Sequence, residues 1–226
     1  MFNLKEELKT KGINITDSMV QMFDQYFHML VRYNEKNNIT RITDEDDVYA
    51  LHFYDSLMTS LAIQNKKGKL LDIGAGAGFP SLPLKIVFNE LDVTMVDSVN
   101  KKVIFLKSVI DELKLEGIKA IHERIENLKE YKAYDYVVAR ALSSLKEIIN
   151  YSHKYIKEDG SIIALKGMRK SSEEIEEAKD ILKKYKLKVD SVIPYNVLDR
   201  SYCLIVIKRD KDEWESNCIS RWYLWT

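Results

Sequence analysis

The sequence predicts an α/β fold, in which a mostly parallel seven-stranded sheet follows an N-terminal helical extension. Three observations support this prediction. Apolar residues recur at helical spacing up to about residue 65, short apolar runs then alternate with helical segments, and two strands in succession close the pattern. Alternating strands and helices are typical of parallel sheets, and the final pair implies one antiparallel hairpin. A length of 226 residues suits a single structural domain.

Residues 1–65 contain only helical patterns. Leu4 and Leu8 mark a short helix that Gly12 ends, and Thr16 is suited to cap a longer helix. Apolar side chains recur every three or four residues in the longer helix, which predicts one buried face. A third helix fits residues 46–63. The apolar positions of the longer helix are Val20, Phe23, Phe27, Leu30 and Tyr33.

The pattern changes near residue 66, so we place the α/β core at residues 66–210 and a divergent tail at residues 211–226. Gly160 is suited to end a helix of the core. The expected helices of the core are 103–113, 145–156 and 173–185, besides one that follows the glycine turn described below. The expected strands are 69–73, 93–97, 118–121, 134–139, 161–165, 187–193 and 202–207.

Composition and charge exclude several classes of protein. Lys plus Arg and Asp plus Glu both number 35, so the net charge gives no indication of a nucleic-acid partner. The two cysteines, Cys203 and Cys218, lie far apart and outside any C-x-x-C pair. We therefore expect no disulfide framework, no metal site and a cytoplasmic location. The N-terminus lacks a signal-peptide pattern, and no apolar run approaches the roughly 18 residues of a membrane span.

The strongest functional signal is the glycine turn, residues 72–80. Gly74, Gly76 and Gly78 occupy alternate positions, which lets a strand turn sharply into a helix and lets the backbone approach a ligand closely. The G-x-G-x-x-G fingerprint of dinucleotide sites would need a third glycine where Phe79 stands. A plain strand–turn–helix junction remains the alternative interpretation.

Two acids flank this turn and distinguish between possible ligands. Asp72 precedes the first glycine and would repel a pyrophosphate, whereas the amino group or the sulfonium of a methionine derivative would be attracted. Asp97 ends the next strand, where an acid accepts hydrogen bonds from ribose hydroxyls. The spacing therefore favours S-adenosylmethionine over NAD as the cofactor.

Several ordered blocks of residues resemble one family, the glucose-inhibited division protein B proteins, which are bacterial 16S rRNA guanine-N7 methyltransferases. Residues 33–42 are similar to the family's W-N-x-x-x-N-L-T segment. The resemblance covers about residues 20–207, and its order makes it more specific than any single block. The tail departs from the basic, proline-rich ending of the family, and it holds all three tryptophans. The remaining blocks are residues 52–57, 78–80, 97–106, 124–126, 134–141 and 164–167.

The resemblance implies a Rossmann-like class I S-adenosylmethionine-dependent methyltransferase. Its implied reaction is methyl transfer from S-adenosylmethionine to N7 of a guanosine in 16S rRNA of the small ribosomal subunit. The alternatives are another RNA, a protein or a small molecule as acceptor, or a nucleotide-binding module without activity. A monomer is the default expectation. The family's cofactor contacts fall on Gly74, Phe79, Ile125, Glu126 and Arg140.

Guanine N7 carries an exposed lone pair, so the reaction requires orientation of the base and no proton removal before attack. Two cations are the candidate catalytic residues. Arg140 follows the strand 134–139, where ligands bind in such sheets, and it either bridges cofactor and RNA or forms a salt bridge. Lys166 ends the strand 161–165 and either contacts phosphate or lies in a solvated loop.

The substrate rim is expected to come from the helical extension and from the segment after Asp97. His52 and Asp55 lie three residues apart and so share one helix face, although structural anchoring is an equally good interpretation. The predicted substrate-binding residues are Asn38, Arg41, His52, Asp55 and Lys101.

Overall fold

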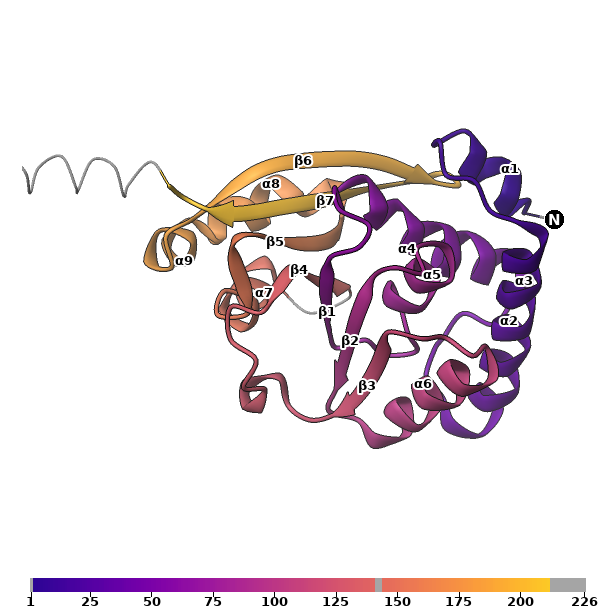
Figure 1. Ribbon diagram of the computed structural model, residues 1–226. Coiled ribbons are helices and arrows are strands. Elements are labelled where there is room, and N and C mark those ends of the chain that lie inside the picture. The colour runs from indigo at the N-terminus through magenta and orange to yellow at the C-terminus, as the bar shows by residue number, and fades with distance from the viewer. Residues whose placement is uncertain (1, 141–143, 212–226) are drawn as a thin grey trace, which may run out of the picture.

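The computed structural model describes residues 2–140 and 144–211 (Figure 1). Its centre is one seven-stranded sheet with the order β3-β2-β1-β4-β5-β7-β6. Strands β1 to β5 pair in parallel, and β7 is antiparallel to both of its neighbours. The expected mostly parallel sheet with one hairpin is confirmed. The strands are β1 Lys69–Ile73, β2 Asp92–Asp97, β3 Ile118–His122, β4 Tyr134–Arg140, β5 Ile156–Gly167, β6 Leu187–Val197 and β7 Arg200–Arg209.

Apolar side chains alternate between the two faces of the sheet. Leu70 and Val138 belong to one buried cluster, while their neighbours Leu71 and Val137 belong to a second. The first cluster is covered by α5 Ser81–Val87, α6 Asn100–Glu112 and the N-terminal helices, and the second by α7 Leu145–Ser152, α8 Met168–Glu177 and α9 Lys179–Lys184 (Figure 1). Helices on both faces leave the two ends of the parallel strands as the places where loops gather.

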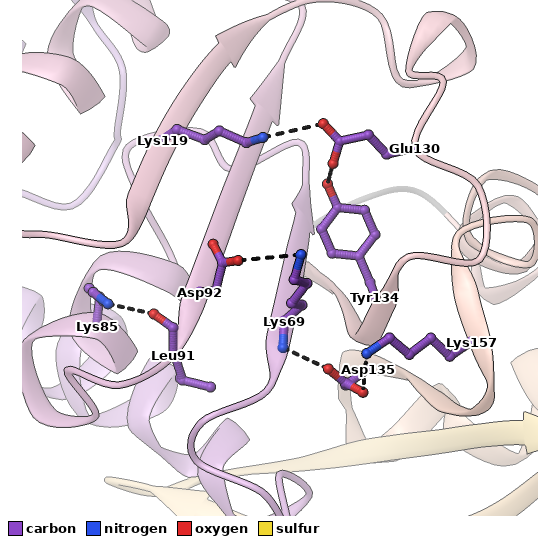
Figure 2. A network of polar contacts seen from close by, with 9 residues as sticks. All are labelled: Lys69, Lys85, Leu91, Asp92, Lys119, Glu130, Tyr134, Asp135 and Lys157. Atoms are coloured by element: carbon purple, nitrogen blue, oxygen red, sulfur yellow. Dashed lines mark hydrogen bonds and ion pairs between the residues drawn. The ribbon is translucent and has the colours of Figure 1, made fainter.

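Ion pairs join neighbouring strands at the amino ends of the parallel strands (Figure 2). Lys69 of β1 lies 3.8 Å from Asp92 of β2, and Lys157 of β5 lies 2.8 Å from Asp135 of β4. The Asp135 carboxylate also accepts a 2.8 Å hydrogen bond from the backbone N–H of Lys69. Such half-exposed pairs contribute about 0–1 kcal/mol each. Ion pairs and a hydrogen bond between neighbouring strands therefore hold this end of the sheet. The functional site lies at the opposite end.

The helical extension packs directly on the first cluster. Helix α2 begins after Thr16, whose side chain accepts from the N–H of Met19, and ends at Asn38, which has a left-handed φ of 47°. The helix expected at residues 46–63 is divided into four short pieces, one of which is π-helical. The N-terminal elements are α1 Leu4–Lys9, α2 Asp17–Asn37, α3 Glu45–Val48, the π-helix η1 Tyr49–Tyr54, α4 Asp55–Met58 and the 3₁₀-helix η2 Thr59–Leu61.

The expected end of the helix before β5 was wrong. That helix ends at Ser152, and β5 already begins at Ile156, which pairs with Tyr134 before a register shift. Gly160 therefore lies inside β5 and ends no helix. A Cβ on Gly160 would approach the Tyr134 carbonyl oxygen to 2.9 Å, so the irregularity requires glycine. Among the described residues, no helix is long and apolar enough to cross a bilayer.

Candidate active site

A cavity of about 620 Å³ lies at the carboxyl ends of the central strands. This volume is within the roughly 300–1,000 Å³ of small-molecule sites. Its wall combines the glycine turn, the ends of β2 and β4, the segment after β3, and parts of the helical extension. The described residues that line it are Ile39, Thr40, His52, 73–77, Phe79, 96–99, Lys102, 123–126, Arg140 and Tyr151.

The glycine turn presents backbone to this cavity. Gly74 and Gly76 have φ values of 71° and 60°, in the left-handed region that favours glycine. The N–H of Gly74 donates to the Val96 carbonyl at 2.8 Å, which ties the turn to β2. A Cβ on Gly76 would have only the Gly74 carbonyl oxygen nearby, at 3.8 Å, so the space in front of Gly76 is open. The turn thus leaves room for a ligand against its first two glycines.

Gly78 has a different role from the other two glycines. It does not line the cavity, and a Cβ there would lie 2.3 Å from Leu82 and 2.6 Å from the hydroxyl of Tyr26. Its φ of 104° also excludes most other residues. Gly78 therefore permits close packing of the turn on α2 and α5, and a direct cofactor contact there stays a prediction.

Asp97 joins the turn to the wall of the cavity. One carboxylate oxygen accepts from the N–H of Gly76 at 2.9 Å, and the other accepts from the N–H of Val99 at 2.9 Å. Lys102 approaches the first oxygen at 3.8 Å. Each oxygen retains a further acceptor direction. The fixed carboxylate at the end of β2 therefore suits a ligand hydroxyl, as expected for a ribose.

Asp72 lies behind the turn and does not reach the cavity wall. Its carboxylate is fully buried, and neither oxygen makes a hydrogen bond of regular geometry. Burial raises the pKa of Asp72 to about 7, and the nearby hydroxyl and N–H of Ser81 oppose this rise. Asp72 can act on a bound cation only through the field that it creates, and contact with the cofactor stays a prediction.

The 3₁₀-helix η3, Ile125–Asn127, forms the wall beside the end of β3. Ile125 is buried and Glu126 is exposed. The carbonyl of Ile125 accepts from the hydroxyl of Tyr155, and the carbonyl of Glu126 accepts from Lys154 at 3.2 Å. These contacts fix the backbone of η3 and leave the Glu126 carboxylate at the cavity, where it can accept from an amino group such as that of adenine.

Arg140 is at the centre of a polar cluster on the other side of the cavity. Its Nη2 donates to the carbonyl of Leu51 at 2.5 Å and lies 3.3 Å from Nδ1 of His52. It also pairs with the Asp55 carboxylate at 3.1 Å. The guanidinium lies 5.6 Å from the centre of the Phe79 ring. Arg140 is therefore a salt-bridge partner as well as a wall residue, and its role as a bridge between cofactor and RNA stays a prediction.

The ring of His52 stacks on Phe79, with centroids 4.2 Å apart. Burial and the positive charge of Arg140 lower the pKa of His52 to about 3. Since Nδ1 faces the donor of Arg140, the neutral ring carries its proton on Nε2, which lies 2.9 Å from the hydroxyl of Thr40. His52 is thus an uncharged wall residue at neutral pH.

The other predicted site residues lie outside the cavity wall. Lys166 is buried and pairs with Glu174 at 2.6 Å. Lys101 donates to the carbonyl of Asn37 at 2.5 Å, next to Asn38, and Arg41 is exposed. Asn38, Arg41 and Lys101 come from the two segments that border the cavity, whereas Lys166 lies near α8.

Several residues of the site were not singled out from the sequence, and Thr40 and Tyr195 are the clearest cases. Thr40 lines the cavity, and its loop is held by the buried Asn34, whose side chain accepts from the N–H of Ile39 at 2.7 Å and of Thr40 at 2.9 Å. Asn34 and Thr40 lie in the block 33–42, so the family resemblance of that block was the available signal. Tyr195 donates to Asp55 at 2.7 Å from β6, and no local pattern indicated this long-range contact.

Together, the sheet order, the open glycine turn and the fixed acid at the end of β2 fit S-adenosylmethionine. The fold and site define a class I S-adenosylmethionine-dependent methyltransferase. Solved structures support the fold: a SAM-dependent methyltransferase from Aquifex aeolicus has a TM-score of 0.58 at 16% identity and covers 75% of this chain and 96% of its own. TYW2 from P. horikoshii, solved in complex with MeSAdo, has a TM-score of 0.56 at 15% identity and covers 68% of this chain and 61% of its own.

The chain belongs to the GidB family, rRNA small subunit methyltransferase G, whose model matches residues 19–201. A ribosomal RNA small subunit methyltransferase G from Streptococcus gordonii is 41% identical over 91% of this chain and 89% of its own length. One from Streptococcus suis is 45% identical over 77% of this chain and 76% of its own. The resemblance stated from the sequence is confirmed, and so are the methyltransferase class and its cofactor.

Proposed function

We propose that this protein transfers a methyl group from S-adenosylmethionine to N7 of a guanosine in 16S rRNA of the small ribosomal subunit, as a monomer in the cytoplasm. The observation that carries the proposal is the cavity in which the glycine turn and Asp97 face Arg140, in a chain of the rRNA small subunit methyltransferase G family. Its streptococcal relatives are named as methyltransferases of small-subunit ribosomal RNA.

The cofactor would lie along the glycine turn, with its ribose at Asp97 and its adenine at η3. Gly74 and Gly76 supply the backbone surface, and Ile125 and Glu126 supply an apolar contact and an acceptor. When bound, S-adenosylmethionine supplies an activated methyl group on a cationic sulfur. The field of Asp72 and Asp97 favours a cation on that side of the cavity.

Methylation at N7 requires no general base. The N7 lone pair forms the new bond to carbon while the carbon–sulfur bond breaks, and the positive charge passes from sulfur to the guanine ring. The residues of the chain therefore act by orientation and by exclusion of water. His52 fits this role, because it is neutral and stacked on Phe79. Arg140, next to both rings, would stack on or donate to the guanine.

A basic border supports RNA as the acceptor despite the zero net charge. Lys102 and Arg140 line the cavity, and Arg41 and Lys101 lie in the segments beside it. These four cations come from α6, β4 and the helical extension, which all contribute to the cavity wall, and they are suited to phosphate contacts. A phosphate contact by Lys166 would require RNA to compete with its pair to Glu174.

The test is transfer of tritiated methyl groups to 16S rRNA, both naked and in the 30S particle, followed by nucleoside analysis. We expect label in 7-methylguanosine. A substrate with 7-deazaguanosine at the labelled position lacks the N7 lone pair and should accept no methyl group. Label in another nucleoside, or label that persists in the 7-deaza substrate, would refute N7 as the target. Absence of label from both RNA forms would refute rRNA as the acceptor.

A further inference from the structure

Asp55 is a buried acid next to the cavity, but its carboxylate does not line the cavity wall. One oxygen lies 3.1 Å from Nη2 of Arg140, and the other accepts a 2.7 Å hydrogen bond from the hydroxyl of Tyr195. Asp55 is 4% exposed and Tyr195 is 6% exposed. The three side chains thus form a chain of contacts that begins on β6 and ends at the cavity.

The three residues that make these contacts come from separate parts of the fold. Arg140 is the last residue of β4, Asp55 begins α4 directly after the π-helix η1, and Tyr195 lies near the end of β6. The guanidinium also contacts Leu51 and Ser56, at 2.5 Å and 3.4 Å, from the same short segment. π-helical turns are frequent at functional sites. Here the turn brings several acceptors against one arginine.

Neither Asp55 nor Tyr195 is among the described residues that line the cavity, so their effect on a ligand must pass through Arg140. A buried carboxylate that keeps one oxygen bonded to tyrosine has a fixed rotation, and the other oxygen then fixes the plane of the guanidinium. Without the tyrosine hydroxyl, that oxygen would be buried and unpaired, and the carboxylate would turn to find another partner. When the carboxylate turns, the orientation of the Arg140 guanidinium relative to the Phe79 ring would change as well.

We propose that Asp55 and Tyr195 are positioning residues that hold the Arg140 guanidinium in the plane in which it meets the guanine base. The inference rests on the proposed function, since it assigns Arg140 to the methyl acceptor. It also gives the antiparallel strand pair β6 and β7 a role in the reaction. An error of about 1 Å in the position of a reacting group can lower a rate by roughly 100-fold.

The matched variants are Tyr195→Phe and Tyr202→Phe. Both remove one hydroxyl group, and the two rings stack on each other with centroids 5.8 Å apart, but only Tyr195 bonds to Asp55. We expect Tyr195→Phe to lower kcat on the 30S particle by roughly 10-fold or more, a larger factor than the change in its KM for S-adenosylmethionine. Tyr202→Phe should retain the wild-type kcat. Equal rates for the two variants would overturn the proposal.

A double-mutant cycle separates positioning from a general structural role. In an Arg140→Lys background, Tyr195→Phe should lower the single-turnover rate by less than about 2-fold, because the planar guanidinium on which it acts is gone. An equally large decrease in both backgrounds would show that Tyr195 acts independently of Arg140. A native circular dichroism spectrum of Tyr195→Phe at the assay temperature, equal to that of Tyr202→Phe, would exclude misfolding as the cause.

A second measurement does not depend on the RNA substrate. In the wild type, nitrogen NMR should show separate signals for the two Nη groups of Arg140, because its contacts with Leu51, Ser56 and Asp55 slow rotation of the guanidinium. Tyr195→Phe and Asp55→Asn should shift these signals, and Tyr202→Phe should not. If wild-type protein methylates no rRNA but the signals behave as described, only the proposed function fails. Unchanged signals in Tyr195→Phe would refute the positioning role.

Discussion

The charge of the buried Asp72 should make the stability of this protein depend on pH in a predictable way. The carboxylate is fully buried, without hydrogen bonds of regular geometry, and its pKa rises from 3.8 to about 7. A raised pKa means that the folded state binds the proton more tightly than the unfolded state does. The stability due to this group is therefore complete below about pH 4 and is lost as the pH rises to about 7.

The magnitude follows from the size of the pKa shift. A change from 3.8 to about 7 corresponds to roughly 4 kcal/mol of unfolding free energy, reached at about 1.4 kcal/mol per pH unit. This value is an upper bound, because water penetration and relaxation reduce it. His52 has the opposite effect, since its pKa falls to about 3 and stability is lost as the pH drops below about 6.5. The two effects partly cancel, so the unfolding free energy of the wild type alone would depend less on pH.

The assay compares the wild type with Asp72→Asn by urea unfolding between pH 4 and 9. The variant should gain stability relative to the wild type as the pH rises to about 7, with no further gain above about pH 8. Ser81→Ala removes the hydroxyl that opposes the rise in the pKa of Asp72. In this variant, the pH range over which stability is lost should therefore extend to higher pH. If the difference in unfolding free energy between wild type and Asp72→Asn is constant from pH 4 to 9, the reasoning is refuted.

Three further changes follow from the geometry of the site. Asp97→Asn removes the charged acceptor at the cavity and should weaken S-adenosylhomocysteine binding by roughly 10- to 100-fold in calorimetry, and unchanged affinity would contradict the ribose assignment. Gly78→Ala should lower the unfolding free energy by about 2–4 kcal/mol, whereas Gly12→Ala, which also has a positive φ but nothing within 4 Å, should lower it by about 1 kcal/mol. Similar losses in both glycine variants would contradict the close-packing argument. The His52 ring should show no NMR titration between pH 5 and 8 and should keep its proton on Nε2. A titration midpoint near pH 6.5 would exclude the buried, neutral state.

Local signals were sufficient for the cofactor side of the site. Gly74, Gly76 and Asp97 could be predicted because a strand, a tight turn and a terminal acid each leave a pattern within a few residues. The sheet itself was predictable for the same reason, since each strand is a separate apolar run. Gly78 was assigned to the cofactor from the same pattern, although its environment shows a packing role. A spacing rule identifies where glycine is needed but does not distinguish a ligand from a neighbouring side chain.

The acceptor side depends on contacts between distant residues. Asp55 was expected on the substrate rim and on the same helix face as His52, but the π-helix η1 ends between them and only His52 lines the cavity. The sequence could not show that Asp55 is 4% exposed, because its burial is created by β6, and Tyr195 lies 140 positions further along the chain. Lys166 ends its strand, as expected, but the orientation of its side chain is set by Glu174 of α8. Side-chain direction at strand ends is therefore decided by tertiary packing.

The helical extension is part of the active site as well as a cover for the sheet. Phe79, at the end of the glycine turn, contacts the rings of Tyr26 and His52 and the guanidinium of Arg140. The acceptors that hold Arg140 come from η1 and the start of α4, whereas the described part of the core places the Phe79 ring beside this cation. One fold can host many functions, and the residues of its site decide which one it performs. In this chain, the selection of the methyl acceptor would come from the surface that the extension adds to the glycine turn.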